Sequence, residues 1–373
     1  ELKYLCWTIK ILKNMAYKIL YLEDLNPETK VAELSSYGYD VDAYKPSSLE
    51  ETLSKISIGE YDALIFDYKL TANREKNANK LYNAPTVAQT LRSTGFNVPI
   101  ILVSSQKVIT ESFNADYTSQ DLFDFCVSKE NFSKDIEKYC KRIDSFIKAY
   151  KEIEEQAFNI TKILKISNVQ WKELDYRFKE QINMAHTKTN VYAICRFIHY
   201  ELLRSIGPLI GEDVLSARLG ISKKSKDWDK VLDYLKQYQY NGILSDVYRR
   251  WWWFGIEQIL KTISSDSLRL LSANDRVKII KDKLNITDLI PIQIAKYAQS
   301  DMFWSICKIT HIAIDPNIDG FDARAQRNFP WQEKEFVSAY GVLNVAPLWL
   351  KKLDASDRQA IRKIAKNIAK DEE

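Results

Sequence analysis

Four short apolar runs in the first third of the chain each end in polar residues, and this pattern constrains the fold more than any other feature. The runs and the residues that end them are 19–22 with Glu23 and Asp24, 64–66 with Asp67, 100–103 with Ser104, and 125–127 with Ser128 and Lys129. Such continuous apolar runs are typical of parallel strands covered on both faces. Because ligands bind outside the carboxyl ends of such strands, we expect these polar side chains to converge at one edge.

The pattern predicts an α/β N-terminal domain over residues 15–132, with a flavodoxin-like, doubly wound, five-stranded parallel sheet. Residues 1–14 are apolar and basic without a small-residue cleavage site, and we interpret them as an N-terminal extension. A helical period begins at Ser133. It predicts a long linker helix over 133–166, followed by a mostly α-helical output domain over 167–373.

The residue types at the predicted edge favour phosphoryl chemistry on a metal. Glu23, Asp24 and Asp67 form an all-oxygen donor set with no histidine or cysteine, which suits a hard divalent ion such as Mg²⁺. A cation is also required if three crowded carboxylates are to stay ionised. Asp67 would act as the nucleophile and form an acyl phosphate, while Ser104 and Lys129 would contact the phosphoryl oxygens.

Residues 15–132 resemble the receiver domain of two-component response regulators, in the order and the strand context of these positions. The resemblance implies that Asp67 is the phosphoacceptor, that Ser104 and Lys129 are the switch pair, and that a sensor histidine kinase or another phosphodonor protein is the partner. It implies four magnesium ligands: Glu23, Asp24, Asp67 and the backbone carbonyl of Lys69.

The sequence departs from the receiver pattern at positions that usually transmit the signal. Cys126 stands where an aromatic switch residue is expected, and Glu130 replaces the proline that usually follows the lysine. The loop after Asp67 is extended over residues 72–80. These departures keep a second hypothesis open, in which the domain is a non-phosphorylated pseudo-receiver that serves as a kinase-docking or interaction platform.

Charge is distributed unevenly along the chain. Residues 15–132 carry 11 basic and 17 acidic side chains, and residues 133–373 carry 40 basic and 32 acidic ones. The basic C-terminal region leaves open a DNA-binding transcriptional regulator, in which residues 215–222 would form part of a helix-turn-helix. Nucleic acid is not favoured, because the basic loop 223–227 supplies no apolar anchor before Trp228.

The predicted linker helix has an apolar seam with heptad spacing. Its members are Ile143, Phe146, Tyr150, Ile153, Ala157, Ile160 and Leu164. The seam can form a homodimer through residues 143–164, or it can pack on the chain's own carboxyl-terminal domain. The sequence does not separate these two alternatives.

The region 167–373 offers no motif for a catalytic output, so we expect a signalling protein and not an enzyme. Its output would act by protein–protein contact or by oligomerisation.

Helices are predicted in the region 167–373 at about 170–205, 210–219, 227–240, 243–264, 273–283, 288–310, 332–342 and 354–370. The string 249–254 contains three tryptophans, and on a helix at least one of them would enter the core. Five scattered cysteines and no membrane-spanning apolar run favour a cytoplasmic protein.

Overall fold

The computed structural model describes residues 16–70, 82–185, 190–264, 267–323 and 329–371, and the chain divides into two units. Unit 1 contains residues 1–163 and 185–196, and unit 2 contains residues 164–184 and 197–373. The predicted extension at residues 1–14 and the predicted loop at 72–80 lie outside the described residues.

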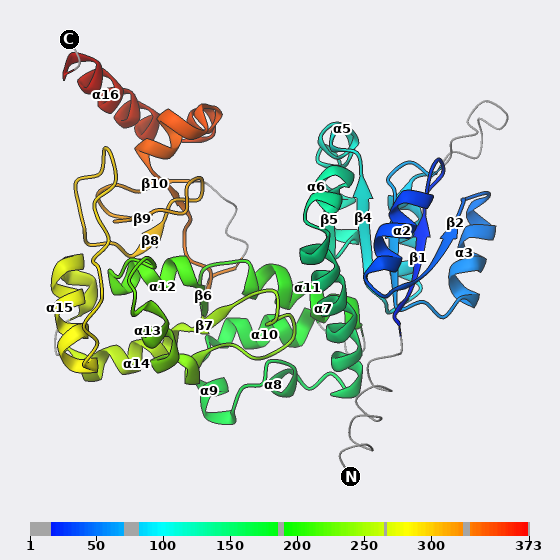
Figure 1. Cartoon of the computed structure of the whole chain (residues 1–373), viewed down its shortest axis with the longest axis horizontal. Coiled ribbons are helices and arrows are strands. Elements are labelled where there is room, and N and C mark those ends of the chain that lie inside the picture. The colour runs from blue at the N-terminus through cyan, green and yellow to red at the C-terminus, as the bar shows by residue number, and fades with distance from the viewer. Residues whose placement is uncertain (1–15, 71–81, 186–189, 265–266, 324–328, 372–373) are drawn as a thin grey trace. The chain divides into compact units, whose positions relative to one another are not determined.

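Unit 1 is built on a parallel sheet with the strand order β2-β1-β3-β4-β5 (Figure 1). Its elements are β1 (Lys18–Leu22), α2 (Glu28–Ser36), β2 (Asp40–Tyr44), α3 (Leu49–Ile58), β3 (Ala63–Phe66), α4 (Ala84–Ser93), β4 (Ile100–Ser104), α5 (Gln106–Val108), η2 (Ile109–Phe113), η3 (Gln120–Leu122), β5 (Phe125–Ser128), α6 (Lys129–Lys134), α7 (Ile136–Glu155) and α8 (Ile160–Ile163). All four neighbouring strand pairs are parallel. This order is the flavodoxin-like, doubly wound topology, so the predicted fold class is confirmed.

The strands of the sheet centre are buried on both sides. Every residue of β3 and β4 is buried, and in β1 only Lys18 is partly exposed. Successive side chains of a strand point to opposite faces, so burial of consecutive residues requires cover on both faces. The continuous apolar runs of the sequence are therefore explained by crossover helices on each side of the sheet.

The predicted helix over 133–166 is interrupted, and this expectation is wrong. Asp135 separates α6 from α7, and α7 ends at Glu155, before Ala157 and Phe158, which have positive φ values of 47° and 59°. Such left-handed residues cannot continue an α-helix. The apolar seam of α7 is buried within unit 1: Ile143, Phe146 and Ile153 are each 0% exposed, and Tyr150 is 2% exposed. The seam of α7 packs within unit 1 and not on the carboxyl-terminal domain, so the packing alternative is wrong in its partner. Because these residues are buried, α7 presents no free apolar seam for a dimer.

Unit 2 is rich in helix but also contains short strands. Its elements are α9 (Asn168–Glu173), α10 (Tyr176–Ala185), η4 (Ile198–Leu203), β6 (Leu209–Gly211), α12 (Glu212–Leu219), α13 (Trp228–Tyr234), η5 (Lys236–Tyr238), β7 (Arg250–Trp252), α14 (Trp253–Ile263), η6 (Leu268–Leu270), α15 (Ala273–Leu284), β8 (Ser305–Ile306), β9 (Ala313–Ile314), β10 (Phe321–Asp322), β11 (Phe336–Val337), η7 (Gly341–Val345), η8 (Pro347–Lys352) and α16 (Ala355–Asp371). The helix between α10 and η4, α11 (Val191–Phe197), belongs to unit 1 except for Phe197. The strands form three antiparallel pairs, β6·β7, β8·β9 and β10·β11.

Two predicted helices of unit 2 are not observed. The segment 288–310 is an irregular chain that contains the short strand β8, and 332–342 contains β11 before η7 begins. The tryptophan string is also not wholly helical, because Trp251 and Trp252 lie in β7 and α14 begins only at Trp253. Trp251 is 0% exposed, so the expected entry of one tryptophan into the core is confirmed.

The segment proposed as a helix-turn-helix does not offer a surface for reading DNA. The first helix, α12, is buried from Val214 to Leu219. The helix that follows, α13, buries Trp228, Val231 and Leu232, and its charged residues are Asp229, Lys230 and Asp233. A net negative helix face disfavours contact with phosphates.

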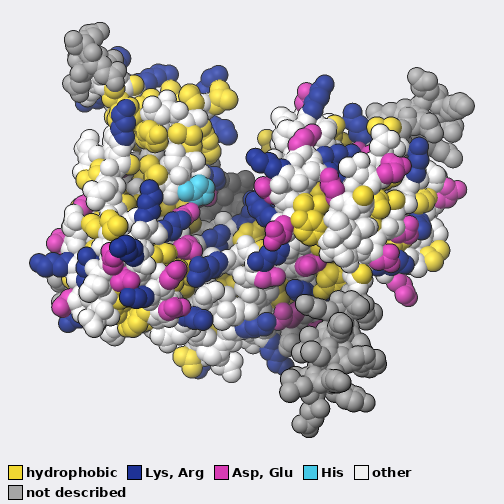
Figure 2. All heavy atoms as spheres, in the orientation of Figure 1, with side chains coloured by type: hydrophobic (Ala, Val, Ile, Leu, Met, Phe, Trp, Pro, Cys, Tyr) yellow, Lys and Arg dark blue, Asp and Glu magenta, His cyan; other side chains and the backbone are white. Residues whose placement is uncertain are grey.

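On the face of the molecule shown in Figure 2, basic and acidic side chains are intermixed. Among the described residues, no helix is both long and apolar enough to cross a membrane.

Candidate functional site

The predicted polar residues converge at the carboxyl edge of the sheet in unit 1. Glu23 and Asp24 follow β1, Asp67 follows β3, and Ser104 is the last residue of β4. Lys129 is the first residue of α6, which begins there because the Ser128 hydroxyl accepts a hydrogen bond from the Asn131 amide. The parallel register of β1 and β3 pairs Leu22 with Phe66, so the acidic residues that follow these two strands lie side by side.

The three carboxylates form one tight cluster. One oxygen of each of Glu23, Asp24 and Asp67 lies within 4.8 Å of the others, and all three residues are buried. Lys129 Nζ forms an ion pair with Glu23 Oε2 and lies 3.4 Å from Asp67 Oδ1. The cluster therefore holds three carboxylates against one ammonium group.

Burial and mutual repulsion disfavour the ionised carboxylates. Burial raises the pKa of Asp24 to about 6, and the charges of Asp67 and Glu23 add to the shift. Burial also raises the pKa of Asp67, although the neighbouring charge of Lys129 opposes this. Burial by itself lowers the pKa of Lys129, but the hydrogen bond to Glu23 and the charge of Asp67 outweigh it and leave the pKa raised.

The donor set fits a hard divalent cation. Its ligands are carboxylate oxygens, which Mg²⁺ prefers, and their negative charge exceeds what Lys129 can balance. Oδ1 of Asp67 is buried and makes no hydrogen bond with the described residues, and its one charged contact is Lys129 Nζ at 3.4 Å, so this oxygen has room for a further ligand. The residues that would hold the ion are Glu23, Asp24 and Asp67. Lys69, whose carbonyl is the fourth predicted ligand, follows closely and pairs with Asn83 in an isolated β-bridge.

The remaining predicted positions have distinct environments. Ser104 is 1% exposed at the end of β4, and hydrogen bonding by its hydroxyl partly offsets the raised pKa of Asp67. Cys126 is partly buried in β5, and burial raises the pKa of its thiol to about 12. The position where the receiver resemblance predicts an aromatic residue therefore holds a small neutral thiol group.

Sequence reasoning missed one residue that positions the site. Tyr21, 1% exposed, donates its hydroxyl hydrogen to Glu23 Oε2 at 3.0 Å. This oxygen is therefore held by Tyr21 and Lys129 together. Residues two apart in a strand lie on the same side, and this spacing was the available signal for the contact.

No protein-family model and no curated protein matches this sequence. Among solved structures, it is similar to the response regulator protein TrrA from Thermotoga maritima in complex with Mg²⁺ and BeF, with 25% identity and a TM-score of 0.27. That match covers 34% of this chain and 98% of the other. The receiver domain of a sensor histidine kinase from Pseudomonas aeruginosa, with a magnesium ion in its active-site cleft, matches at 20% identity and a TM-score of 0.28. Here 35% of this chain and 98% of the other are covered.

A third match comes from a family of streptococcal redox sensors that evolved from two-component response regulators. The identity is 19%, the TM-score is 0.30, and the match covers 38% of this chain and 55% of the other. These matches account for about the N-terminal third of the chain.

Proposed function

We propose that this chain is a response-regulator-like signalling protein. In this proposal unit 1 is a receiver that accepts a phosphoryl group on Asp67 and thereby controls unit 2. The observation that carries this proposal is the cluster of three buried carboxylates within 4.8 Å of one another, with Lys129 3.4 Å from Asp67. Similarity to receiver structures from other organisms supports the same assignment. In this proposal unit 2 is the output, which acts through protein–protein contact or oligomerisation.

The residues of the site have separate tasks in the proposed transfer. An oxygen of Asp67 forms a bond to phosphorus while the bond between phosphorus and the donor breaks, and its electron pair leaves with the donor. Lys129 supplies a positive charge beside the reacting oxygen, and the Ser104 hydroxyl supplies a hydrogen bond to a phosphoryl oxygen. Mg²⁺ held by Glu23, Asp24 and Asp67 would offset the negative charge of the carboxylates and of the phosphoryl group.

The orientation of Glu23 depends on two neighbours that do not accept the phosphoryl group. Tyr21 and Lys129 both donate hydrogen bonds to Oε2 of Glu23. Lys129 contacts Glu23 and Asp67 in this state, and phosphoryl oxygens on Asp67 would compete with Glu23 for its ammonium group. This exchange is the local change that a phosphorylation switch requires, and it does not depend on an aromatic residue at Cys126.

The proposal is tested by incubating the purified chain with acetyl phosphate and Mg²⁺ and measuring its intact mass. We expect one added phosphoryl group that hydroxylamine removes, as for an acyl phosphate. Asp67→Asn should abolish the addition. Asp40→Asn is the matched control, because Asp40 is an exposed aspartate at the start of β2.

Two results would contradict the proposal. Equal modification of the native chain and of Asp67→Asn would place the phosphoryl group on another residue. No modification by acetyl phosphate or by candidate histidine kinases, with Mg²⁺ in excess, would leave the docking platform as the remaining role for the acidic cluster.

A further inference from the structure

Unit 2 contains a cavity of about 420 Å³ that the proposed receiver chemistry does not use. Segments far apart in the sequence contribute to its lining, among them the ends of η4 and β8, the start of α12 and the start of β7. Five basic and three acidic side chains line it, which leaves two positive charges when His311 is neutral. This excess of positive charge favours an anionic ligand.

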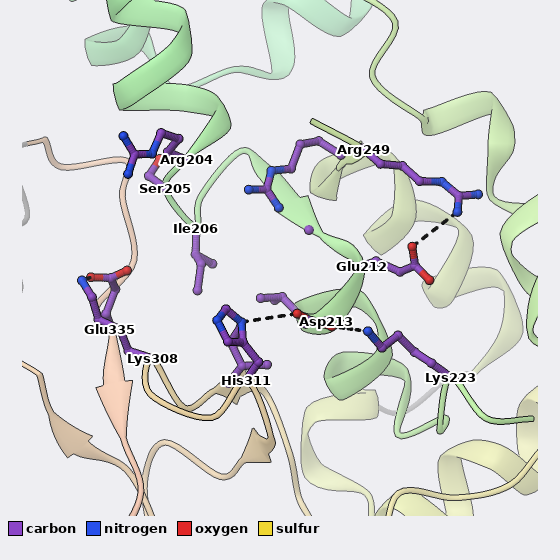
Figure 3. Close-up of a pocket in the computed structure, with 14 residues that line it drawn as sticks. Arg204, Ser205, Ile206, Glu212, Asp213, Lys223, Arg249, Lys308, His311 and Glu335 are labelled. Carbon is purple, nitrogen blue, oxygen red and sulfur yellow. Dashed lines mark hydrogen bonds and ion pairs between the residues drawn. The ribbon is translucent and has the colours of Figure 1, made fainter. Parts of the chain in front are cut away.

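The acidic side chains of the cavity already have basic partners. Glu212 pairs with Arg249 at 3.3 Å, as Figure 3 shows, and Glu335 pairs with Lys308. Asp213 forms an ion pair with Lys223, and its Oδ2 lies 3.4 Å from Nδ1 of His311. Lys223 and His311 lie on opposite sides of the Asp213 carboxylate (Figure 3).

Two arginines account for the excess charge. Neither Arg204 nor Arg250 forms an ion pair with a described residue. Arg204 is exposed and lies over the ring of Tyr200, 4.8 Å from its centroid. Arg250 is partly buried, and burial lowers the pKa of its guanidinium group, which nevertheless stays protonated at neutral pH. The charge of Asp213 acts on Arg250, but Asp213 forms its ion pair with Lys223 and not with Arg250. An incoming anion would therefore stabilise this partly buried cation.

The fold positions Arg250 at the cavity through its neighbours. Its Nε donates a hydrogen bond to the Leu203 carbonyl at 2.6 Å, and the strand pairing places Arg250 opposite Gly211. A Cβ atom at position 211 would lie only 2.0 Å from Arg250 Nη1. Glycine therefore leaves the space that the guanidinium group occupies, while the Nη atoms make no hydrogen bond with the described residues.

We propose that this cavity binds a small phosphate monoester and that Arg250 holds its phosphoryl group. Arginine suits this task because its planar fork matches phosphate oxygens. The cavity is larger than a phosphate ion and falls in the range of sites for small organic ligands. Ile206, Val214 and Ile306 supply an apolar wall for the organic part, and the paired charged residues supply hydrogen bonds for its hydroxyl groups.

The proposal is tested by isothermal titration calorimetry of the full chain at low salt, with EDTA to keep metal out of unit 1. The probes are the four ribonucleoside monophosphates, ribose 5-phosphate and glycerol phosphate, beside inorganic phosphate and the four uncharged nucleosides. We expect at least one monoester to bind, and to bind at least about tenfold more tightly than its nucleoside or than inorganic phosphate.

Two variants test the role of Arg250. Arg250→Gln removes the charge, and Gly211→Ala displaces the guanidinium group while altering only the end of a flexible side chain. Each should weaken binding at least about tenfold without changing the thermal midpoint of unit 2 by more than a few degrees. Lys226→Gln is the control, because the Lys226 side chain is 85% exposed and lies outside the cavity lining.

Several outcomes would overturn the proposal. One is the absence of binding by every monoester up to about 10 mM, where even a millimolar Kd is detectable. Another is binding that both variants retain in full. Inorganic phosphate binding as tightly as the esters would refute recognition of an organic part. Asp67→Asn should leave the titration unchanged, so the result is independent of the proposed phosphoacceptor.

Discussion

Replacing Asp67 by asparagine should stabilise unit 1 when no divalent ion is present. At an effective dielectric constant near 20, two charges 4.8 Å apart repel by about 3.5 kcal/mol, and Asp67 faces two carboxylates within this distance. The two carboxylates together repel Asp67 by about 7 kcal/mol, and the attraction of Lys129 at 3.4 Å offsets about 5 kcal/mol of this total. The difference predicts a gain of about 2 kcal/mol for the neutral side chain.

The assay must report on unit 1 alone. All tryptophans of the described chain lie in unit 2, so tryptophan fluorescence does not serve. Hydrogen exchange, measured by mass spectrometry on peptides from β1 and β3, reports on unit 1 alone. In EDTA these peptides should exchange more slowly in Asp67→Asn than in the native chain. Mg²⁺ should slow exchange in the native chain and have little effect on the variant.

The control for this experiment is Asp40→Asn, which removes an exposed carboxylate outside the cluster and should change neither measurement. The reasoning is refuted if the native chain is the more protected of the two in EDTA. It is refuted equally if Mg²⁺ protects both proteins to the same extent, because the ion would then bind without Asp67.

The remaining predictions concern buried groups. Asp124→Ala should cost about 3–5 kcal/mol in urea unfolding followed by circular dichroism, because it leaves Arg92, now paired at 2.9 Å, as a buried unpaired charge. Adding Arg92→Met should restore part of this loss, and no recovery would contradict the explanation. The Cys126 thiol, with its pKa raised to about 12, should react slowly with iodoacetamide at pH 8 in peptide mapping. Its contribution to stability should fall as the pH rises above 9.0, where the unfolded thiol ionises first. Gly220→Ala should cost at least about 1 kcal/mol in thermal unfolding, since φ is +70° and a Cβ would lie 2.9 Å from the Ala273 Cα; an unchanged midpoint would refute this.

The sheet of unit 1 was predictable because its signals are local. Apolar runs define the strands, and the residue after each run lies at the sheet edge whatever the helices do. The boundary of the unit was not predictable in the same way. The helical period that continues past Phe132 indicates an amphipathic helix but not what covers its apolar face. In the structure that cover lies within unit 1, where Phe146 contacts Phe125 and Tyr150 donates a hydrogen bond to Asp124.

Unit 2 was less predictable because long-range contacts outweigh local propensity there. Arg276 is 0% exposed and donates hydrogen bonds to the carbonyls of Phe303 and Arg218, at 2.6 and 3.0 Å. Such bonds satisfy the backbone of an irregular segment, so the chain near Phe303 does not need to be helical. A charged residue in a helical pattern predicts exposure, and here it is buried instead.

The sequence by itself determined the parallel sheet and the acidic residues at its edge, since strand ends and residue types are local properties of the chain. Only the tertiary structure decided that the α7 seam packs inward and that Arg250 lies beside Gly211. The physical reason is that the cavity joins residues from position 204 to position 335, and no local pattern specifies which distant segments will pack together or which charges they will leave unpaired.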